Sequence, residues 1–260
     1  MNGSLQAASG RYFEPFLGSG ALFFHLRPAR ATLSDLNAEL VNAYRQVCDR
    51  VDEVIEALRP LRHSQREYKK QRQLVPDGAL ERAVQFIYLN RTCWNGLYRV
   101  NRAGRFNVPI GRHRYPRVCD PEVLRAAGGA LRGAKLLAGD FEDVLKDARE
   151  GDFVYLDPPY ATAAHPRANG FIEYNSSLFA LADQKRLAAV AHDLRRRGCL
   201  VLISNVDHPT IVSLFRGFRS TRISRSSTIA GIITDRGKVR ERLFLNFALE
   251  DLGASNGSTA

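Results

Sequence analysis

Short apolar runs alternate with longer amphipathic stretches along most of this chain, and that order limits the folds open to it. Six runs have the length and composition of buried strands: residues 11–16, 31–35, 134–140, 152–157, 199–205 and 241–247. Stretches with helical character lie at about 20–26, 37–61, 80–94 and 178–197. Strands that alternate with helices predict an α/β fold, with a mostly parallel sheet and helices on both of its faces.

The size of the chain fits one large domain, or a core with a modest insertion, at 260 residues and 29.1 kDa. No apolar run reaches the roughly 18 residues of a membrane-spanning helix, and the start "MNGSLQAASG" has no signal-peptide core. Scattered cysteines without metal-ligand spacing are expected to be free thiols in a reducing cytoplasm: Cys48, Cys93, Cys119 and Cys199.

The segment "DFVYLDPPYAT" at 152–162 ends an apolar run on an acid followed by two prolines. Proline has no amide donor and fixes its own φ, so Pro158 and Pro159 stop the strand there. One interpretation is a plain strand terminator. The other is that a carbonyl and the Asp157 carboxylate are held still for chemistry.

Other strand ends carry polar residues of the same kind. Gly18 and Gly20 follow the first predicted strand, Asp35 ends the second and Asp140 ends the third. Ligands of such sheets bind at the carboxyl ends of the strands. Glycines beside an acid that accepts ribose hydroxyls predict a nucleoside site, and the missing third glycine favours S-adenosylmethionine over NAD. Asp140 has an alternative, as the N-cap of a helix beginning "FEDVL".

The charge of the chain is concentrated in one segment. Residues 61–117 hold 13 Lys and Arg against three Asp and Glu, whereas the rest of the chain holds 25 and 24. A basic block on a nearly neutral body is typical of a protein that binds a polyanion. Within it, the Gly- and Pro-rich part "NGLYRVNRAGRFNVPIGRHRYP" predicts a hairpin-like loop.

Several motifs together resemble the Dam family of adenine-specific DNA methyltransferases. In chain order they are "FEPFLGSGALFFHL", "LSDLNAELVNAY", "FIYLNRTCWNGLYRVNRAGRFNVPIGR", "LLAGDFEDVL", "YLDPPY", "VLISN" and "ISRSSTIAGIITDRGKVRERLF". The resemblance implies a Rossmann-like methyltransferase sheet, S-adenosyl-L-methionine as the cofactor and double-stranded DNA as the partner. It also implies a catalytic domain in two parts, 11–60 and 131–250, around an inserted target-recognition domain at 61–130. We expect a monomer that needs no metal and no membrane.

The resemblance assigns roles to the strand-end residues. The Asp157 carboxylate and the Pro158 carbonyl would accept the two hydrogens of an adenine amine, and Tyr160 would stack on the base, which must be flipped out of the duplex. The implied catalytic residues are Asp157, Pro158, Pro159 and Tyr160. The implied cofactor-binding residues are Glu14, Pro15, Phe16, Gly18, Ser19, Gly20, Asp35, Asn37, Asp140, Phe141 and Asp157.

The basic segment is expected to contact DNA in two ways. The clustered cations without turn residues, Arg62, Arg66, Lys69 and Lys70, would bind phosphates. The arginines around the hairpin would bind guanine edges. Tyr98 either fills the gap left by the flipped base or packs in the core. The expected DNA-binding residues are Lys69, Asn90, Arg91, Asn95, Tyr98, Arg99, Asn101, Arg102, Arg105, Asn107, Arg112 and Arg225. The family's usual target is GATC.

The sequence leaves alternatives open. Family members usually carry a Trp-x-Gly-Gly-Lys-like segment before the first strand, which "NGSLQAASG" does not match. One alternative is therefore a DNA-binding relative with reduced or lost catalysis. Another is a methyltransferase that acts on a different nucleic acid or on a protein glutamine. A role in restriction–modification, in the host or in a phage is equally open.

Overall fold

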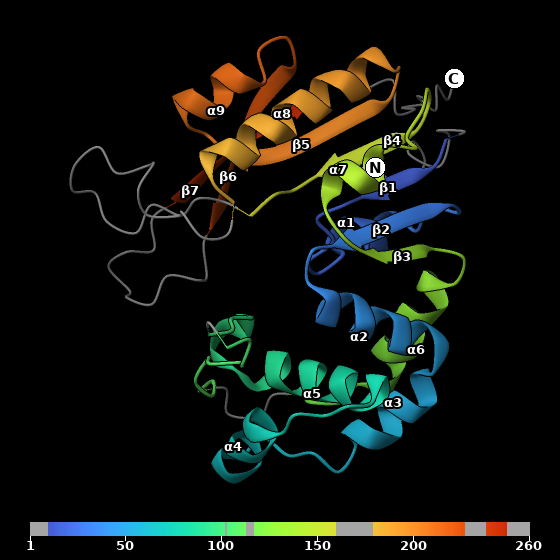
Figure 1. The fold of residues 1–260 in the computed structure, drawn as a ribbon, viewed down its shortest axis with the longest axis vertical. Helices are drawn as coiled ribbons and strands as arrows, with labels where there is room; N and C mark the ends of the chain where they lie inside the picture. Colours follow the sequence, from blue (N-terminus) through green and yellow to red (C-terminus); the bar gives the residue numbers. More distant parts are fainter. Residues whose placement is uncertain (1–9, 102, 113–116, 160–178, 227–237, 249–260) are drawn as a thin grey trace, which may run out of the picture. The chain divides into compact units, whose positions relative to one another are not determined.

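The computed structural model describes residues 10–101, 103–112, 117–159, 179–226 and 238–248 of the chain (Figure 1). The chain divides into two compact units, Met1–Leu36 with Gly139–Ala260, and Asn37–Ala138. A division into compact units does not identify the residues that bind DNA. The target-recognition domain expected at 61–130 therefore stays a prediction.

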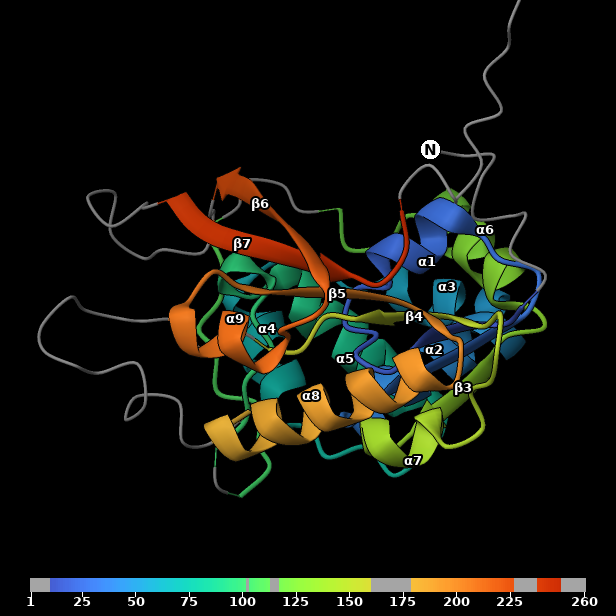
Figure 2. The same cartoon turned by 90° about the horizontal axis from the view of Figure 1, so that it is seen from above.

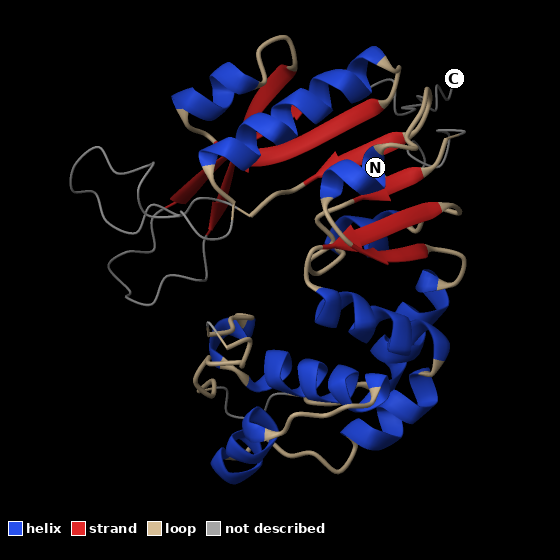
Figure 3. Ribbon diagram, in the orientation of Figure 1, coloured by secondary structure: helices blue, strands red, loops and turns tan. Residues whose placement is uncertain are grey.

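The described strands form one seven-stranded sheet in the order β3-β2-β1-β4-β5-β7-β6 (Figure 3). β1 pairs in parallel with β2 and with β4, and β4 pairs in parallel with β5. β7 is antiparallel to both of its neighbours, β5 and β6. The predicted α/β fold with a mostly parallel sheet is confirmed. The strands are β1 (Tyr12–Glu14), β2 (Ala31–Asp35), β3 (Lys135–Ala138), β4 (Phe153–Leu156), β5 (Leu200–Val206), β6 (Arg219–Ser226) and β7 (Lys238–Leu245).

Adjacent residues of β1 pack on opposite faces of the sheet, because side chains alternate along a strand. Tyr12 contacts Phe23 of α1 on one face, with ring centroids 6.4 Å apart. Phe13 belongs to the main core, which includes Leu145 of α7 and Leu187 of α8. Figure 2 shows α7 and α8 on one side of the sheet and α1 on the other. The helices of this unit are α1 (Ala21–Leu26), α7 (Phe141–Leu145), α8 (Leu181–Arg196) and α9 (Pro209–Leu214).

The second unit is mainly helical. The stretch of helical character at 37–61 forms two helices, because Arg50 leaves the helical region, with φ −137° and ψ 40°. α2 and α6 approach closely at Gly128, where a Cβ would lie 2.6 Å from the Val47 carbonyl oxygen. The helices are α2 (Ala38–Asp49), α3 (Val51–Leu58), α4 (Gln65–Gln73), α5 (Ala79–Thr92), the 3₁₀ turn η2 (Trp94–Gly96) and α6 (Pro121–Leu131).

The hairpin-like loop predicted after α5 is present. Val100 and Phe106 form an antiparallel bridge, and the Asn101 amide donates to the Arg105 carbonyl at 2.8 Å. The Asn101 side chain accepts from the amides of Ala103 and Arg105, each at 3.0 Å. An asparagine that closes a turn on its own backbone explains why this polar segment has a defined shape.

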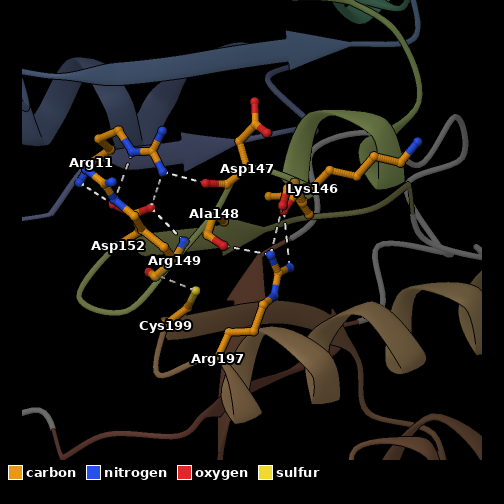
Figure 4. A network of polar contacts seen from close by, with 9 residues as sticks. Arg11, Lys146, Asp147, Ala148, Arg149, Asp152, Arg197 and Cys199 are labelled. Atoms are coloured by element: carbon orange, nitrogen blue, oxygen red, sulfur yellow. Dashed lines mark hydrogen bonds and ion pairs between the residues drawn. The ribbon is translucent and has the colours of Figure 1, made fainter.

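A buried ion pair joins the starts of β1 and β4 (Figure 4). The Asp152 side chain is 3% exposed and accepts from the Arg11 guanidinium at 2.7 Å. It also accepts from the backbone amides of Arg11 at 2.7 Å and Arg149 at 2.9 Å. Burial disfavours the charged form of Asp152, but these hydrogen bonds outweigh it and lower the pKa of the carboxyl.

The described part of the chain contains no cluster of three or more His, Cys, Asp or Glu that can hold a metal ion. It also contains no helix with the length and apolar character needed to cross a membrane. All four cysteines are free thiols.

Candidate active site

The glycine loop after β1 lies against the end of β2. The Leu17 amide donates to the Ser34 carbonyl at 2.9 Å, and the Gly18 amide donates to Asp35 Oδ2 at 3.0 Å. Gly18 and Gly20 have φ of 46° and 63°, in the left-handed region that favours glycine. A Cβ on Gly18 would meet no atom within 4 Å, so this backbone faces open space beside the Asp35 carboxylate.

Glu14 ends β1 as a buried carboxyl. It is 2% exposed and accepts from the Tyr12 hydroxyl at 2.8 Å. Burial raises the pKa of Glu14 to about 7, and the negative charge of Asp157 acts in the same direction. Two carboxyl groups therefore lie close enough to interact at this edge of the sheet.

The DPPY segment, residues 157–160, follows directly after Leu156, the last residue of β4. β4 lies between β1 and β5, which brings Asp157 to the same edge as Glu14. Asp157 is half-buried, Pro158 is buried and Pro159 is exposed. Tyr160 lies outside the described residues.

Asp140 and Phe141 form the start of α7. Asp140 Oδ1 accepts from the Glu142 amide at 3.0 Å, so the N-cap alternative considered for Asp140 is observed. Phe141 is buried, and its ring lies 5.3 Å from that of Phe16, which follows β1. Phe179 completes the aromatic group, 5.7 Å from Phe16 and 6.1 Å from Phe141.

A cation that the sequence did not indicate connects this region to α8. Arg186 contacts Asp140 and Glu142, both at 2.9 Å, and its guanidinium lies 5.0 Å above the Phe141 ring. Arg186 is 46 positions from Asp140 in the chain, so no local pattern relates them. Tyr12 was also missed, although its position two residues before Glu14 places both on one face of β1.

Asn37 has a structural role in the other unit. Its side chain caps α2 by accepting from the amides of Glu39 at 3.1 Å and Leu40 at 3.3 Å.

Several of the expected DNA-binding residues have partners within their own unit. Asn90 donates to the Gly96 carbonyl at 3.0 Å, and Arg99 donates to Asn107 at 2.8 Å. Asn95 adopts the left-handed conformation at φ 52°. These contacts shape the turn and the hairpin and do not exclude a contact with DNA.

Tyr98 packs within its own unit. Its ring lies 4.9 Å from that of Phe86 and 5.7 Å from that of Phe106. Burial raises the pKa of Tyr98. The packing alternative is therefore observed in this structure, and a role beside a flipped base stays a prediction.

The remaining expected DNA contacts include a group of solvent-facing cations. Those in the second unit are exposed: Lys69, Arg91, Arg105 and Arg112. Arg102 lies outside the described residues. Arg225 belongs to β6, and its side chain is not among the described ones.

A glycine loop after the first strand, with acids at the ends of the neighbouring parallel strands, is the arrangement of a Rossmann-like sheet that binds a nucleoside. A model of the D12 class N6 adenine-specific DNA methyltransferase family matches residues 4–229. The chain belongs to this family.

Named relatives support the assignment over most of the chain. Type II methyltransferase M1.LlaDCHI of Lactococcus lactis subsp. cremoris is 37% identical over 249 residues, covering 91% of this chain and 86% of the relative. Type II methyltransferase M.MjaIII of Methanocaldococcus jannaschii is 35% identical over 232 residues, or 82% and 80%. DNA adenine methylase of Escherichia coli strain K12 is 36% identical over 205 residues, or 75% and 71%.

Proposed function

We propose that this adenine-specific DNA methyltransferase moves a methyl group from S-adenosylmethionine to the exocyclic amine of adenine in duplex DNA, within GATC. The observation that carries the proposal is the arrangement of β2, β1 and β4 as parallel neighbours. Their carboxyl ends bring Asp35, Glu14 and Asp157 to one edge of the sheet. That edge is where ligands of such sheets bind.

The residues at this edge fit an S-adenosyl cofactor. Asp35 is an acceptor for ribose hydroxyls, and the open backbone at Gly18 leaves room for a ligand beside it. The carboxyl groups of Glu14 and Asp157 suit the positive charge of a methionine ammonium. The rings of Phe16 and Phe141 offer an apolar surface to the adenine of the cofactor. When bound, S-adenosylmethionine supplies the methyl group.

The DPPY segment would prepare the DNA adenine for methylation. The lone pair of an adenine amine is conjugated into the ring, which makes the nitrogen a poor nucleophile. The Asp157 carboxylate and the Pro158 carbonyl accept the two amine hydrogens, which draws the lone pair out of the ring. Pro158 and Pro159 restrict the backbone, so the carbonyl dipole is oriented before the reaction begins. Tyr160 stacks on the flipped base.

The basic segment would hold the duplex. Lys69 on α4 is exposed and suits a phosphate contact, which positions the protein without reading sequence. Arg105 is exposed beside the closed turn of the hairpin and suits a guanine edge. We propose a monomer that works in the cytoplasm, where its free cysteines stay reduced. The names of the two Type II relatives support a place in restriction–modification.

A methyl-transfer assay with a panel of substrates tests the proposal. The purified chain is incubated with S-adenosylmethionine carrying a labelled methyl group and with one acceptor at a time. The acceptors are a GATC duplex, a duplex of the same composition without GATC, a single-stranded RNA and a glutamine-containing peptide. We expect label in the GATC duplex alone. Label in both duplexes would refute GATC as the target sequence. Label in RNA or peptide instead of DNA would refute DNA as the substrate.

A binding measurement tests the alternative without catalysis. Titration calorimetry with S-adenosylhomocysteine, the product form of the cofactor, measures whether the site binds its ligand. We expect saturable binding. Tight DNA binding without cofactor binding and without transfer would favour a DNA-binding relative that has lost catalysis.

A further inference from the structure

Arg186 is the centre of a contact network that joins α7 to α8. Its guanidinium contacts Asp140 Oδ1 at 2.9 Å, Glu142 Oε1 at 2.9 Å and Asp183 Oδ1 at 3.1 Å. Asp183 lies in the first turn of α8 and also accepts from the Ala180 amide at 2.9 Å. A planar guanidinium with five fixed donors can hold several carboxylates at once, which a lysine ammonium does less well.

The contacts of Asp140 within this network involve one of its two carboxylate oxygens. The two hydrogen bonds of Asp140 to the described residues, from the Glu142 amide and from Arg186, both use Oδ1. Oδ2 is thereby left to accept a hydrogen bond from another donor. The Asp140 side chain as a whole is 33% exposed.

The same cation also positions the neighbouring aromatic ring. The guanidinium lies 5.0 Å from the centroid of the Phe141 ring. The same ring also packs against Phe16 and Phe179. A single side chain thus sets both the carboxylate and the ring at the start of α7.

Stability alone gives a weak reason for this arrangement. The Arg186 side chain is 42% exposed, and ion pairs of that exposure contribute little to stability because solvent screens them. Its loss would leave three carboxylates near one another without the cation between them. The first turn of α7 would then be pushed away from α8 by like-charge repulsion.

We propose that Arg186 is a positioning residue for the cofactor. It presents Asp140 Oδ2 to the amine of the cofactor's adenine and holds the Phe141 ring against the same base. The inference rests on the proposed S-adenosyl site and adds a residue to it that does not touch the ligand itself.

The test compares Arg186→Gln with Arg196→Gln, a matched change on the same helix. Arg196 lies in the last turn of α8, is exposed and pairs with Asp193 at 3.0 Å. Titration calorimetry gives the dissociation constant of S-adenosylhomocysteine, and thermal melting gives stability. We expect Arg186→Gln to weaken binding about tenfold, which corresponds to the loss of the hydrogen bond between the cofactor's adenine amine and the Asp140 carboxylate. Arg196→Gln should change binding less than about twofold. Both melting temperatures should fall by small amounts, and that of Arg186→Gln by more, because Arg186 pairs with three carboxylates and Arg196 with one.

A double substitution separates positioning from general loosening of the fold. If Arg186 acts through Asp140, Arg186→Gln added to Asp140→Asn should weaken binding much less than it does in the unaltered protein. Arg186→Lys should recover part of the affinity, because it keeps the charge without the fork.

Two results would overturn the inference while leaving the proposed function intact. One is an unchanged dissociation constant for Arg186→Gln. The other is the same weakening with and without Asp140→Asn. If Arg186→Gln does not fold, an Arg186→Lys protein that binds as tightly as the unaltered one has the same meaning. Absence of binding by the unaltered protein would instead refute the S-adenosyl site.

Discussion

Asp152→Asn should destabilise the protein strongly although it lies outside the candidate active site. The carboxylate joins the starts of β1 and β4 by accepting from the Arg11 side chain and from two backbone amides (Figure 4). Asparagine has nearly the same shape, but it has one acceptor oxygen in place of two. The NH₂ group of asparagine is a hydrogen-bond donor, and here it would face the Arg11 guanidinium or a backbone amide, which are donors too.

The magnitude follows from these contacts. Removing one partner of a buried ion pair costs about 3–5 kcal/mol, and a hydrogen bond to a charged group contributes about 1.5–3 kcal/mol. Since Arg11 is 28% exposed and its charge can be solvated, we expect a loss of about 2–4 kcal/mol. For a chain of this size the melting temperature should fall by about 5–10 °C.

Urea unfolding followed by circular dichroism measures this loss at pH 8 and again at low pH. The pKa of Asp152 is lowered in the folded state. Its contribution to stability is therefore complete above the pKa of the unfolded chain and is lost as pH falls through the folded pKa. The difference between the two proteins should shrink in acid.

The matched control is Asp143→Asn, whose carboxylate is 70% exposed and pairs with Lys146 alone among the described residues. It should leave the stability almost unchanged, because solvent screens an exposed ion pair. If Asp152→Asn proves as mild as this control at pH 8, or if its effect does not depend on pH, the role assigned to the ion pair is wrong.

Three further predictions concern binding. Asp35→Ala should weaken S-adenosylmethionine binding by about 1–3 kcal/mol, because it leaves ribose hydroxyls unpaired; an unchanged affinity in calorimetry would remove Asp35 from the site. Cofactor affinity should rise as pH increases through about 7, because ionised Glu14 can pair with the ammonium of the cofactor. Glu14→Gln should make the affinity less dependent on pH, and a pH profile unchanged by the substitution would exclude Glu14 as the cause. Lys69→Ala should weaken binding to all duplexes about equally and reduce the salt dependence of binding. Arg105→Ala should instead reduce the preference for target over non-target DNA by about 1–3 kcal/mol. Equal losses of affinity for target and non-target DNA in both variants would refute this separation of phosphate contacts from base contacts.

The central strands could be predicted from the sequence because burial on both faces makes them nearly continuous apolar runs. β4, with "FVYL", and β5, with "LVLISNV", are of this kind. β6 was not predicted, since "RSTRISRS" has one apolar residue and lies at the edge of the sheet. Arginines suit an edge strand, where charge discourages pairing with another chain.

The helices of the second unit were predicted in part. The apolar spacing over 37–61 indicates a helix but not its interruption, because Arg50 carries no turn signal. α4 was not predicted, because "QREYKKQRQ" buries only Tyr68 and Gln71 and has almost no apolar stripe.

The strand-end acids of the site could be predicted because parallel neighbours bring their carboxyl ends to one edge. This placed Asp35 and Asp157 from local sequence alone. The contacts of Arg186 depend on how α8 packs beside α7, which no local pattern encodes. Tyr98 is a similar case, since only the structure shows that Phe86 and Phe106 surround it.

The most direct test of the account is the base composition of a GATC duplex after incubation with S-adenosylmethionine, measured by mass spectrometry of the released nucleosides. The unaltered protein should produce N6-methyladenine, and Asp157→Ala should produce it at least about a hundredfold more slowly while binding DNA as before. Near-normal turnover by Asp157→Ala would contradict the assignment of the DPPY segment as the catalytic centre, and a methyl group on any other position of the DNA would contradict adenine as the target.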